Sequence, residues 1–409
     1  MTIIQIISTL IVLAGSFGAI NYLFLKLPSA IGILIVALLA SLTILFVNYF
    51  NPQIGIFNQL VEFVDNIEFS EALLEGMLAI LLFAGALHIK ITDLKLQIFP
   101  ILLMATIGVL ISTFIIGFGF SWLTGTPLIF ALIFGALISP TDPVAVIGIL
   151  KQAKLPNSLE TKIAGESLFN DGIGYVIFLL LVGIAFSIDG HNQTSLTDIL
   201  ILFCTEVLGG ALLGAGLGFF TFSLMKRIDD YSLEVLLTLG LALGGYQLAI
   251  FLHLSGPIMV VVAGLFIGHV GLKRGMSAIT RDYINAFWKL IDEMLNAILF
   301  LLIGIKVLSI AFSADVIFIG ILTILLCTFA RLTSVLLTVS ILKPFREFSK
   351  GVVPIMTWGG LKGGISIALA LSLPENEWNY IILSATYIVV IFSIIIQGLT
   401  ISKLATYIK

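Results

Sequence analysis

Long apolar runs dominate this chain, and short polar stretches separate them. A helix crosses the hydrocarbon core of a bilayer with about 20 predominantly apolar residues. Thirteen runs come close to this length or exceed it, at 3–25, 29–50, 70–90, 97–122, 126–150, 160–187, 196–225, 231–252, 256–271, 283–309, 314–342, 351–373 and 377–405. The pattern therefore predicts an all-α polytopic membrane protein with thirteen transmembrane helices.

The distribution of lysine and arginine provides an independent test of this count. Cytoplasmic connections of membrane proteins are enriched in these two residues. If the N-terminus is outside, the alternate connections and the C-terminal end on the cytoplasmic side hold 16 of the 20 basic residues. The opposite connections carry mostly Asp and Glu. We therefore expect a multi-pass protein of the plasma (inner) membrane, with its N-terminus outside and its C-terminus in the cytoplasm.

Composition supports the same class of protein. The chain is 59% hydrophobic and only 11% charged, and its mean hydropathy is +1.19. These values exclude a water-soluble domain of this length. Once the predicted spans are removed, no soluble domain remains, so residues 1–409 are expected to form a single transmembrane transporter domain.

Two predicted spans contain residues that interrupt a helix. The fifth contains SPTDP at 139–143, where the prolines remove backbone donors, and the twelfth contains the glycine-rich WGGLKGG at 358–364. Broken helices at corresponding places in two halves point to a transporter's binding site. The two spans are seven apart, an odd offset, which predicts two inverted six-helix repeats, at about 3–187 and 231–405. The span at 196–225 links them.

Charged residues lie within both interruptions. The ends of half-helices expose unsatisfied backbone groups, partly positive at N-termini and partly negative at C-termini. Asp142 is suited to the N-terminal ends and Lys362 to the C-terminal ends. The alternative is that the prolines only kink a helix, which leaves both charges unexplained.

The sixth span carries a second aspartate, and this one is suited to bind an ion. Asp171 and Ser167 are four residues apart, so they project from one helix face. A hard monovalent cation prefers oxygen ligands, here the Asp171 carboxylate, the Ser167 hydroxyl and an oxygen of Thr141. Burial disfavours the charged carboxylate and a bound cation favours it, so proton and cation exclude each other at Asp171. That competition is sufficient for exchange.

Other ionisable residues in the spans need separate interpretations. Arg331 lies deep in the eleventh span, and an unpaired buried arginine is improbable, so we expect it to pair with Glu166 as a structural contact between helices. Asp292 and Glu293 are interpreted as charges at the start of the tenth helix, with a role in cytoplasmic ion entry as the alternative. Glu234 is interpreted as a charge at the membrane interface.

Five motifs together resemble a known family. They are GESLFNDG at 165–172, SPTDPVA at 139–145, FW at 287–288, LNAILF at 295–300 and GGLKG at 359–363. They look like the sodium/proton exchanger branch of the monovalent cation:proton antiporters, in particular its bacterial and archaeal NhaP-like members. The resemblance covers nearly the whole chain in the expected order.

The resemblance implies a homodimer that exchanges one Na⁺ or Li⁺ for one proton without moving net charge. It assigns the ion or proton to Asp171 and oxygen ligands to Ser167 and Thr141, and it makes Asn170 the marker of electroneutral members. The residues expected at the ion-binding site are therefore Asp171, Ser167, Thr141, Asn170 and Asp142, of which the first three would contact the monovalent cation. This chain departs from the family pattern at two positions. Ala84 occupies a position near which several relatives carry an acidic residue. Lys362 stands where many relatives have arginine; lysine keeps the charge but cannot donate the two parallel hydrogen bonds of a guanidinium.

The function expected from the sequence is therefore secondary active Na⁺(Li⁺)/H⁺ antiport, with K⁺/H⁺ antiport on the same fold as the alternative. A cation channel and an intramembrane aspartyl protease are more remote, since the protease needs Asp142 and Asp171 as a pair in a motif absent here. The partners expected are monovalent cations, protons and the lipid bilayer. We expect no enzymatic activity, no cofactor and no nucleic acid.

Overall fold

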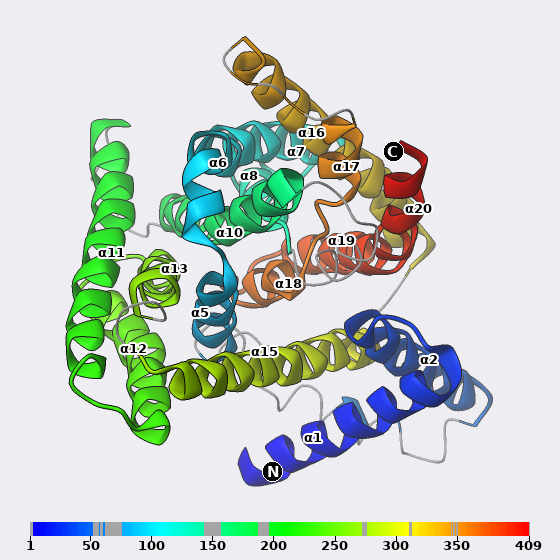
Figure 1. Cartoon of the computed structure of the whole chain (residues 1–409). Coiled ribbons are helices and arrows are strands. Elements are labelled where there is room, and N and C mark those ends of the chain that lie inside the picture. Colours follow the sequence, from blue (N-terminus) through cyan, green and yellow to red (C-terminus); the bar gives the residue numbers. More distant parts are fainter. Residues whose placement is uncertain are drawn as a thin grey trace.

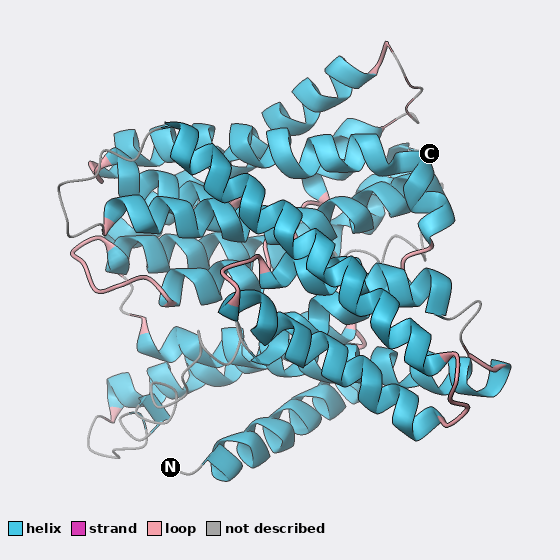
Figure 2. Cartoon of the chain, turned by 90° about the vertical axis from the view of Figure 1, so that its left-hand side faces the viewer, coloured by secondary structure: helices cyan, strands magenta, loops and turns pink. Residues whose placement is uncertain are grey.

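The computed structural model describes residues 3–51, 57, 60–61, 76–142, 157–186, 196–271, 276–310, 313–344, 346, 348 and 351–408. Within these residues, every regular element is a helix (Figure 2). The fold class predicted from the sequence, all-α, is therefore confirmed for the described part of the chain.

The helices follow the chain in the order shown in Figure 1. They are α1 (Ile3–Ile20), η1 (Asn21–Leu25), α2 (Ser29–Phe50), α5 (Leu78–His88), α6 (Ile91–Leu103), η4 (Met104–Gly108), α7 (Val109–Thr124), α8 (Leu128–Ile138), α10 (Asn157–Ala185), α11 (Leu196–Met225), α12 (Tyr231–Phe251), α13 (Gly256–Phe266), η5 (Ile267–Gly271), α15 (Ala278–Lys306), η6 (Val307–Ser309), α16 (Ala314–Leu342), α17 (Val352–Trp358), α18 (Gly364–Leu371), α19 (Asn379–Phe392), η7 (Ser393–Gln397) and α20 (Gly398–Ile408).

Each predicted apolar segment contains helical residues, and eight helices of the described part are long and apolar enough to cross a membrane. These eight are Ile4–Leu25, Ser29–Phe50, Ile91–Thr124, Ser158–Ala185, Ile201–Met225, Tyr231–Phe251, Ala314–Leu342 and Asn379–Tyr407. Shorter apolar helices occupy Leu78–His88, Leu128–Ile138 and Gly256–Gly271.

The start of α15 differs from the prediction. The helix begins at Ala278, where Ser277 Oγ accepts a hydrogen bond from Thr280 N at 3.4 Å, rather than at residue 283. Asp292 and Glu293 therefore lie in the middle of α15, and their interpretation as helix-start charges is wrong. The apolar pattern missed the first half of this helix because it is amphipathic and carries many polar residues.

Two hydrophobic clusters form the interior. One includes residues of α2, α7, α8 and α16–α19, and the other includes residues of α5, α12 and α13. Two long helices contribute to both clusters. From α15, Trp288 packs in the second cluster and Phe300 in the first, while α10 contributes Leu168 to the second and Ile173 to the first. In Figure 1, α15 accordingly extends from α12 toward α2, and α10 lies near the centre.

Small residues allow the closest helix contacts, as is common between membrane helices. A Cβ atom added to Gly117 of α7 would lie 2.6 Å from Leu132 Cδ2 of α8. One added to Gly135 of α8 would lie 3.2 Å from the backbone nitrogen of Gly117, and closer still to the Thr113 carbonyl oxygen. The packing of α7 on α8 therefore requires glycine on both sides.

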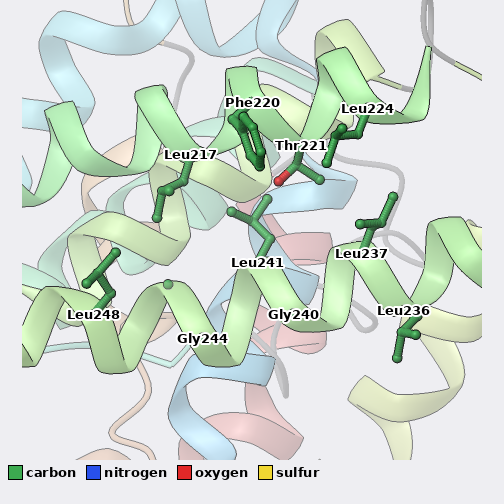
Figure 3. Close-up of a pocket in the computed structure, with 11 residues that line it drawn as sticks. Leu217, Phe220, Thr221, Leu224, Leu236, Leu237, Gly240, Leu241, Gly244 and Leu248 are labelled. Carbon is green, nitrogen blue, oxygen red and sulfur yellow. The ribbon is translucent and has the colours of Figure 1, made fainter. Parts of the chain in front are cut away.

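A groove of about 320 Å³ lies between α11 and α12 (Figure 3). Its lining is apolar apart from Thr221, and it consists of Leu217, Phe220, Thr221, Leu224, Leu236, Leu237, Gly240, Leu241, Gly244, Gly245 and Leu248. Because no ionisable side chain lines this groove, it offers no ligand set for an ion.

The glycine at the α7–α8 contact leads to a stability prediction. Gly135→Ala should destabilise the fold by about 1–3 kcal/mol, because the added methyl group meets backbone atoms that cannot move independently. The thermal unfolding of the detergent-purified protein measures this. Gly216→Ala in α11 is the control, because a Cβ there meets nothing within 4 Å. Equal melting temperatures for the two variants would contradict the packing argument.

Candidate functional site

The structure shows a break in the twelfth predicted span and the end of a helix inside the fifth. The helix α8 ends at Ile138, and residues 140–142 continue without helical structure. In the twelfth predicted span, α17 ends at Trp358 and α18 begins at Gly364. The remainder of the fifth predicted span, from Pro143 onward, lies outside the described residues.

The two interruptions contact each other through their backbones and through one ammonium group. Asp142 N donates a hydrogen bond to Leu361 O at 2.7 Å. Lys362 Nζ donates to Ser139 O at 2.8 Å and to Pro140 O at 3.3 Å. Lys362 therefore neutralises the partly negative C-terminal end of α8, which is the position expected for this residue.

Asp142 lies at the opposite kind of helix end. A Cβ added to Gly363, the residue that precedes α18, would lie 2.6 Å from Asp142 Oδ2. The carboxylate is thus placed against the partly positive N-terminal end of α18, and Gly363 provides the space for it. The place where the two interruptions contact each other is called the crossing. It combines a cation at the C-terminal end of α8 with an anion at the N-terminal end of α18.

Beside the crossing, α10 presents hydroxyl and amide groups to the α8 interruption. The hydroxyl oxygens of Thr141 and Ser167 are 3.0 Å apart. Asn170 Nδ2 donates to Thr141 Oγ1 at 2.9 Å, and Thr141 N donates to Asn170 Oδ1 at 3.3 Å. The Asn170 amide thus holds both the backbone and the side chain of Thr141, a contact that the sequence did not reveal.

Asp171 is the buried carboxylate of this region. It is 6% exposed and lies one helical turn after Ser167 on α10. A buried carboxylate near the hydroxyl oxygens of Ser167 and Thr141 is a ligand set suited to a hard monovalent cation.

The close packing of α10 on the α8 interruption depends on glycine. A Cβ added to Gly174 would lie 3.2 Å from Pro140 Cδ, and one added to Gly172 would lie 3.0 Å from Ile258 Cγ1 of α13. The helix that carries Asp171 therefore packs directly against the ring of Pro140 and the side chain of Ile258, because Gly174 and Gly172 have no side chains of their own.

Glu166 and Arg331 are brought together across α10 and α16. Arg331 Nη2 donates to Glu166 Oε2 at 2.9 Å, and Nη1 donates to Oε1. Arg331 Nε also donates to Met356 O at 3.3 Å, so the same guanidinium reaches the last turn of α17. Both side chains are buried. Arg331 thus connects α10, through Glu166, with α17, through Met356. It leaves no space for a side chain at Gly360.

Three residues outside this centre complete the comparison with the sequence. Ala84 lies in α5 and is fully buried, and its methyl side chain offers no oxygen ligand for an ion. Asp292 accepts a hydrogen bond from Asn296 Nδ2 at its Oδ1 at 3.0 Å. Glu234 is 0% exposed, and both of its carboxylate oxygens are buried without a partner in the described part of the chain. Glu234 lies in the first turn of α12, so its interpretation as a charge at the membrane interface stays a prediction.

Comparisons with known proteins agree with the motifs. The family model described as "Sodium/hydrogen exchanger, transmembrane" matches residues 6–406. A Pseudomonas aeruginosa protein named Na⁺/H⁺ antiporter NhaP is 44% identical over 416 residues, which cover 98% of this chain and 96% of the relative. The Halobacillus dabanensis Na⁺/H⁺ antiporter NhaH is 34% identical over 402 residues, which cover 97% and 96%.

The fold has a counterpart among solved structures. The sodium proton antiporter MjNhaP1 from Methanocaldococcus jannaschii superimposes with a TM-score of 0.77 at 21% sequence identity, and the match covers 100% of this chain and 99% of that one. At this identity the likeness concerns the fold. Together with the family match over nearly all residues, it leads to one conclusion. This chain belongs to the sodium/hydrogen exchanger family of membrane transporters.

Proposed function

We propose that this protein is a secondary active antiporter that exchanges Na⁺ or Li⁺ for H⁺ across a membrane. The observation that carries the proposal is the buried Asp171 carboxylate, which lies beside the Thr141–Ser167 hydroxyl pair next to two crossing interrupted helices. Family membership and the names of the relatives support the same activity.

The mechanism we propose rests on competition at one group. A cation would bind to the Asp171 carboxylate with the oxygens of Ser167 and Thr141, and a proton would bind to the same carboxylate when the cation leaves. Because an empty, charged carboxylate in a buried site is costly, the protein would change its accessible side only when Asp171 is occupied. Each cycle then carries a cation in one direction and a proton in the other.

We propose that this exchange is electroneutral. The residue beside Asp171 is Asn170, whose amide is neutral and is already engaged with Thr141. Asp142 lies against the N-terminal end of α18, and Lys362 is engaged with the carbonyl oxygens of Ser139 and Pro140. The carboxylate left to bind and release charge is therefore Asp171.

We further propose the membrane arrangement that the sequence indicates. It has thirteen spans, with inverted repeats at about 3–187 and 231–405 around a linking span at 196–225. The N-terminus would be outside, the C-terminus cytoplasmic, and the protein a homodimer in the plasma membrane. The interruptions at α8 and between α17 and α18, one in each proposed repeat, support this arrangement.

The first prediction concerns the shared carboxylate. Proteoliposomes with an internal pH dye should show alkalinisation of one compartment when Na⁺ or Li⁺ is added to the other. In Asp171→Asn this signal should fall to the level of empty liposomes, because the amide cannot exchange a proton for a cation. Asp315→Asn, which removes an exposed carboxylate at the start of α16, should keep the signal. Retained exchange in Asp171→Asn would refute the proposal, and a response to K⁺ in place of Na⁺ would identify the K⁺/H⁺ alternative.

The second prediction concerns net charge. The rate of Na⁺/H⁺ exchange should be the same when the membrane potential of the proteoliposomes is clamped at zero or at a large negative value, because a one-for-one exchange moves no net charge. A potassium gradient with valinomycin sets the potential, and the pH dye reports the rate. A rate that depends on voltage would contradict electroneutral exchange.

The third prediction concerns the Glu166–Arg331 pair. Glu166→Gln should reduce the yield of folded protein more than it changes the apparent Na⁺ affinity, because removing one partner of a buried ion pair costs about 3–5 kcal/mol. Size-exclusion profiles and the Na⁺ dependence of exchange measure the two effects. Glu293→Gln is the control, since Glu293 forms an exposed contact with Lys289 at 3.9 Å and such contacts contribute little. A large affinity change at normal yield would instead make Glu166 part of the ion site.

A further inference from the structure

The segment η7 (Ser393–Gln397) is a π-helical turn between α19 and α20. Such turns are rare and are frequently found at functional sites, where they change the direction of side chains within a helix. This one lies beside the crossing, since a Cβ added to Gly398, the residue after η7, would lie 3.6 Å from Leu361 Cδ1. The π turn thus faces the interruption between α17 and α18.

Two buried side chains of η7 form a chain of hydrogen bonds that ends on the interrupted backbone. Lys362 N donates to Ser393 Oγ at 2.9 Å, and Ser393 Oγ donates to Gln397 Oε1 at 2.5 Å. Ser393 is 1% exposed and Gln397 is 6% exposed. The Ser393 hydroxyl acts as donor and acceptor at once, so each hydrogen bond strengthens the other.

The Lys362 N–H needs an acceptor from outside its own helix. Residues 360–363 have no helical structure, so no carbonyl of α17 or α18 is in position to accept it. In a membrane interior, an unsatisfied backbone group costs several kcal/mol. Ser393 provides this acceptor, which fixes the backbone of the residue whose ammonium reaches α8.

The contacts of Lys362 continue to Thr141, which is a proposed ligand of the cation. Lys362 Nζ binds the carbonyl oxygens of Ser139 and Pro140, and the next residue is Thr141. The Thr141 hydroxyl lies 3.0 Å from that of Ser167. A displacement of the Lys362 backbone would therefore move the α8 carbonyls and, with them, the oxygen of Thr141.

We propose that Ser393 and Gln397 are positioning residues of the ion site, and that they set its cation affinity by fixing Lys362 and thereby the place of Thr141. This inference rests on the antiport function proposed above. Neither side chain contacts Thr141, Ser167 or Asp171 through any hydrogen bond in the described part of the chain, so both act through Lys362.

The choice of variant follows from the space around the network. A cavity of about 10 Å³, with Thr357, Lys362, Ser393 and Gln397 in its lining, lies next to these hydrogen bonds. This is roughly the space that one water molecule needs. An alanine at residue 393 would enlarge the cavity. Water could then replace the missing hydroxyl and hide the effect of the substitution. Ser393→Val avoids this, because it fills the space and offers no acceptor. Ser393→Thr has nearly the same shape as valine and keeps the hydroxyl.

The experiment measures the Na⁺ concentration at half-maximal exchange in proteoliposomes. Ser393→Val should raise it about two- to tenfold, the effect of one net hydrogen bond, while the maximal rate and the melting temperature change little. Ser393→Thr should stay near wild type. Gln397→Leu should shift the value in the same direction, and the double variant Ser393→Val with Gln397→Leu should resemble Ser393→Val alone, because both act through one contact.

Ser384→Val controls for added volume, since Ser384 is a buried serine of α19 whose hydroxyl has no partner in the described structure. Its half-maximal Na⁺ concentration should not change. Equal values for Ser393→Val and Ser393→Thr, or an unchanged value in both Ser393→Val and Gln397→Leu, would overturn the inference. Wild-type exchange that is lost in Asp171→Asn but unaffected in both Ser393→Val and Gln397→Leu would refute only this inference. Absence of cation-dependent exchange in the wild type would refute the proposed function itself.

Discussion

The neutralisation of half-helix ends at one crossing is the constraint on which the rest of this structure depends. Helices that stop inside a membrane leave carbonyl and N–H groups that neither lipid nor water can satisfy. Here Lys362 Nζ takes the carbonyls of Ser139 and Pro140, and Asp142 lies against the start of α18. Without these two opposite charges, the interrupted segments would be too costly to keep in the interior. Gly360 and Gly363 leave the necessary space, because a side chain at either position would meet Arg331 or Asp142.

The same irregular backbone creates the chemistry of the site. Because α8 stops at Ile138, the hydroxyl and backbone nitrogen of Thr141 are free of helix geometry, and Asn170 engages both. Ser167 and Asp171 then lie one helical turn apart on α10, next to that hydroxyl. Glu166, on the other side of the same helix, is fixed by Arg331, which also reaches the end of α17. The same helix therefore carries a charge pair fixed between helices and, one turn further along, the carboxylate proposed to bind the ion.

Much of this arrangement could be predicted from local patterns, and the exceptions have specific causes. Hydropathy located the helices, and the residues SPTDP and WGGLKGG located the interruptions, because proline and glycine act on the backbone at their own positions. The start of α15 was missed because its first half is amphipathic. The burial of Glu234 was not predicted because it depends on which helices pack nearby. Likewise, nothing in the sequence around Ser393 and Gln397 indicates that they reach Lys362.

The sequence by itself determined the class of protein, the interrupted helices and the identity of the charged residues, since these follow from composition, spacing and the cost of charge in a membrane. Its motifs were also sufficient to indicate the family. Only the tertiary structure decided the contacts between segments far apart in the chain, such as those of Lys362 with the α8 carbonyls, Asn170 with Thr141 and Ser393 with Lys362. The reason is physical. Hydrophobicity is a property of each segment alone, whereas a hydrogen bond exists only when packing brings a donor and an acceptor within about 3 Å of each other.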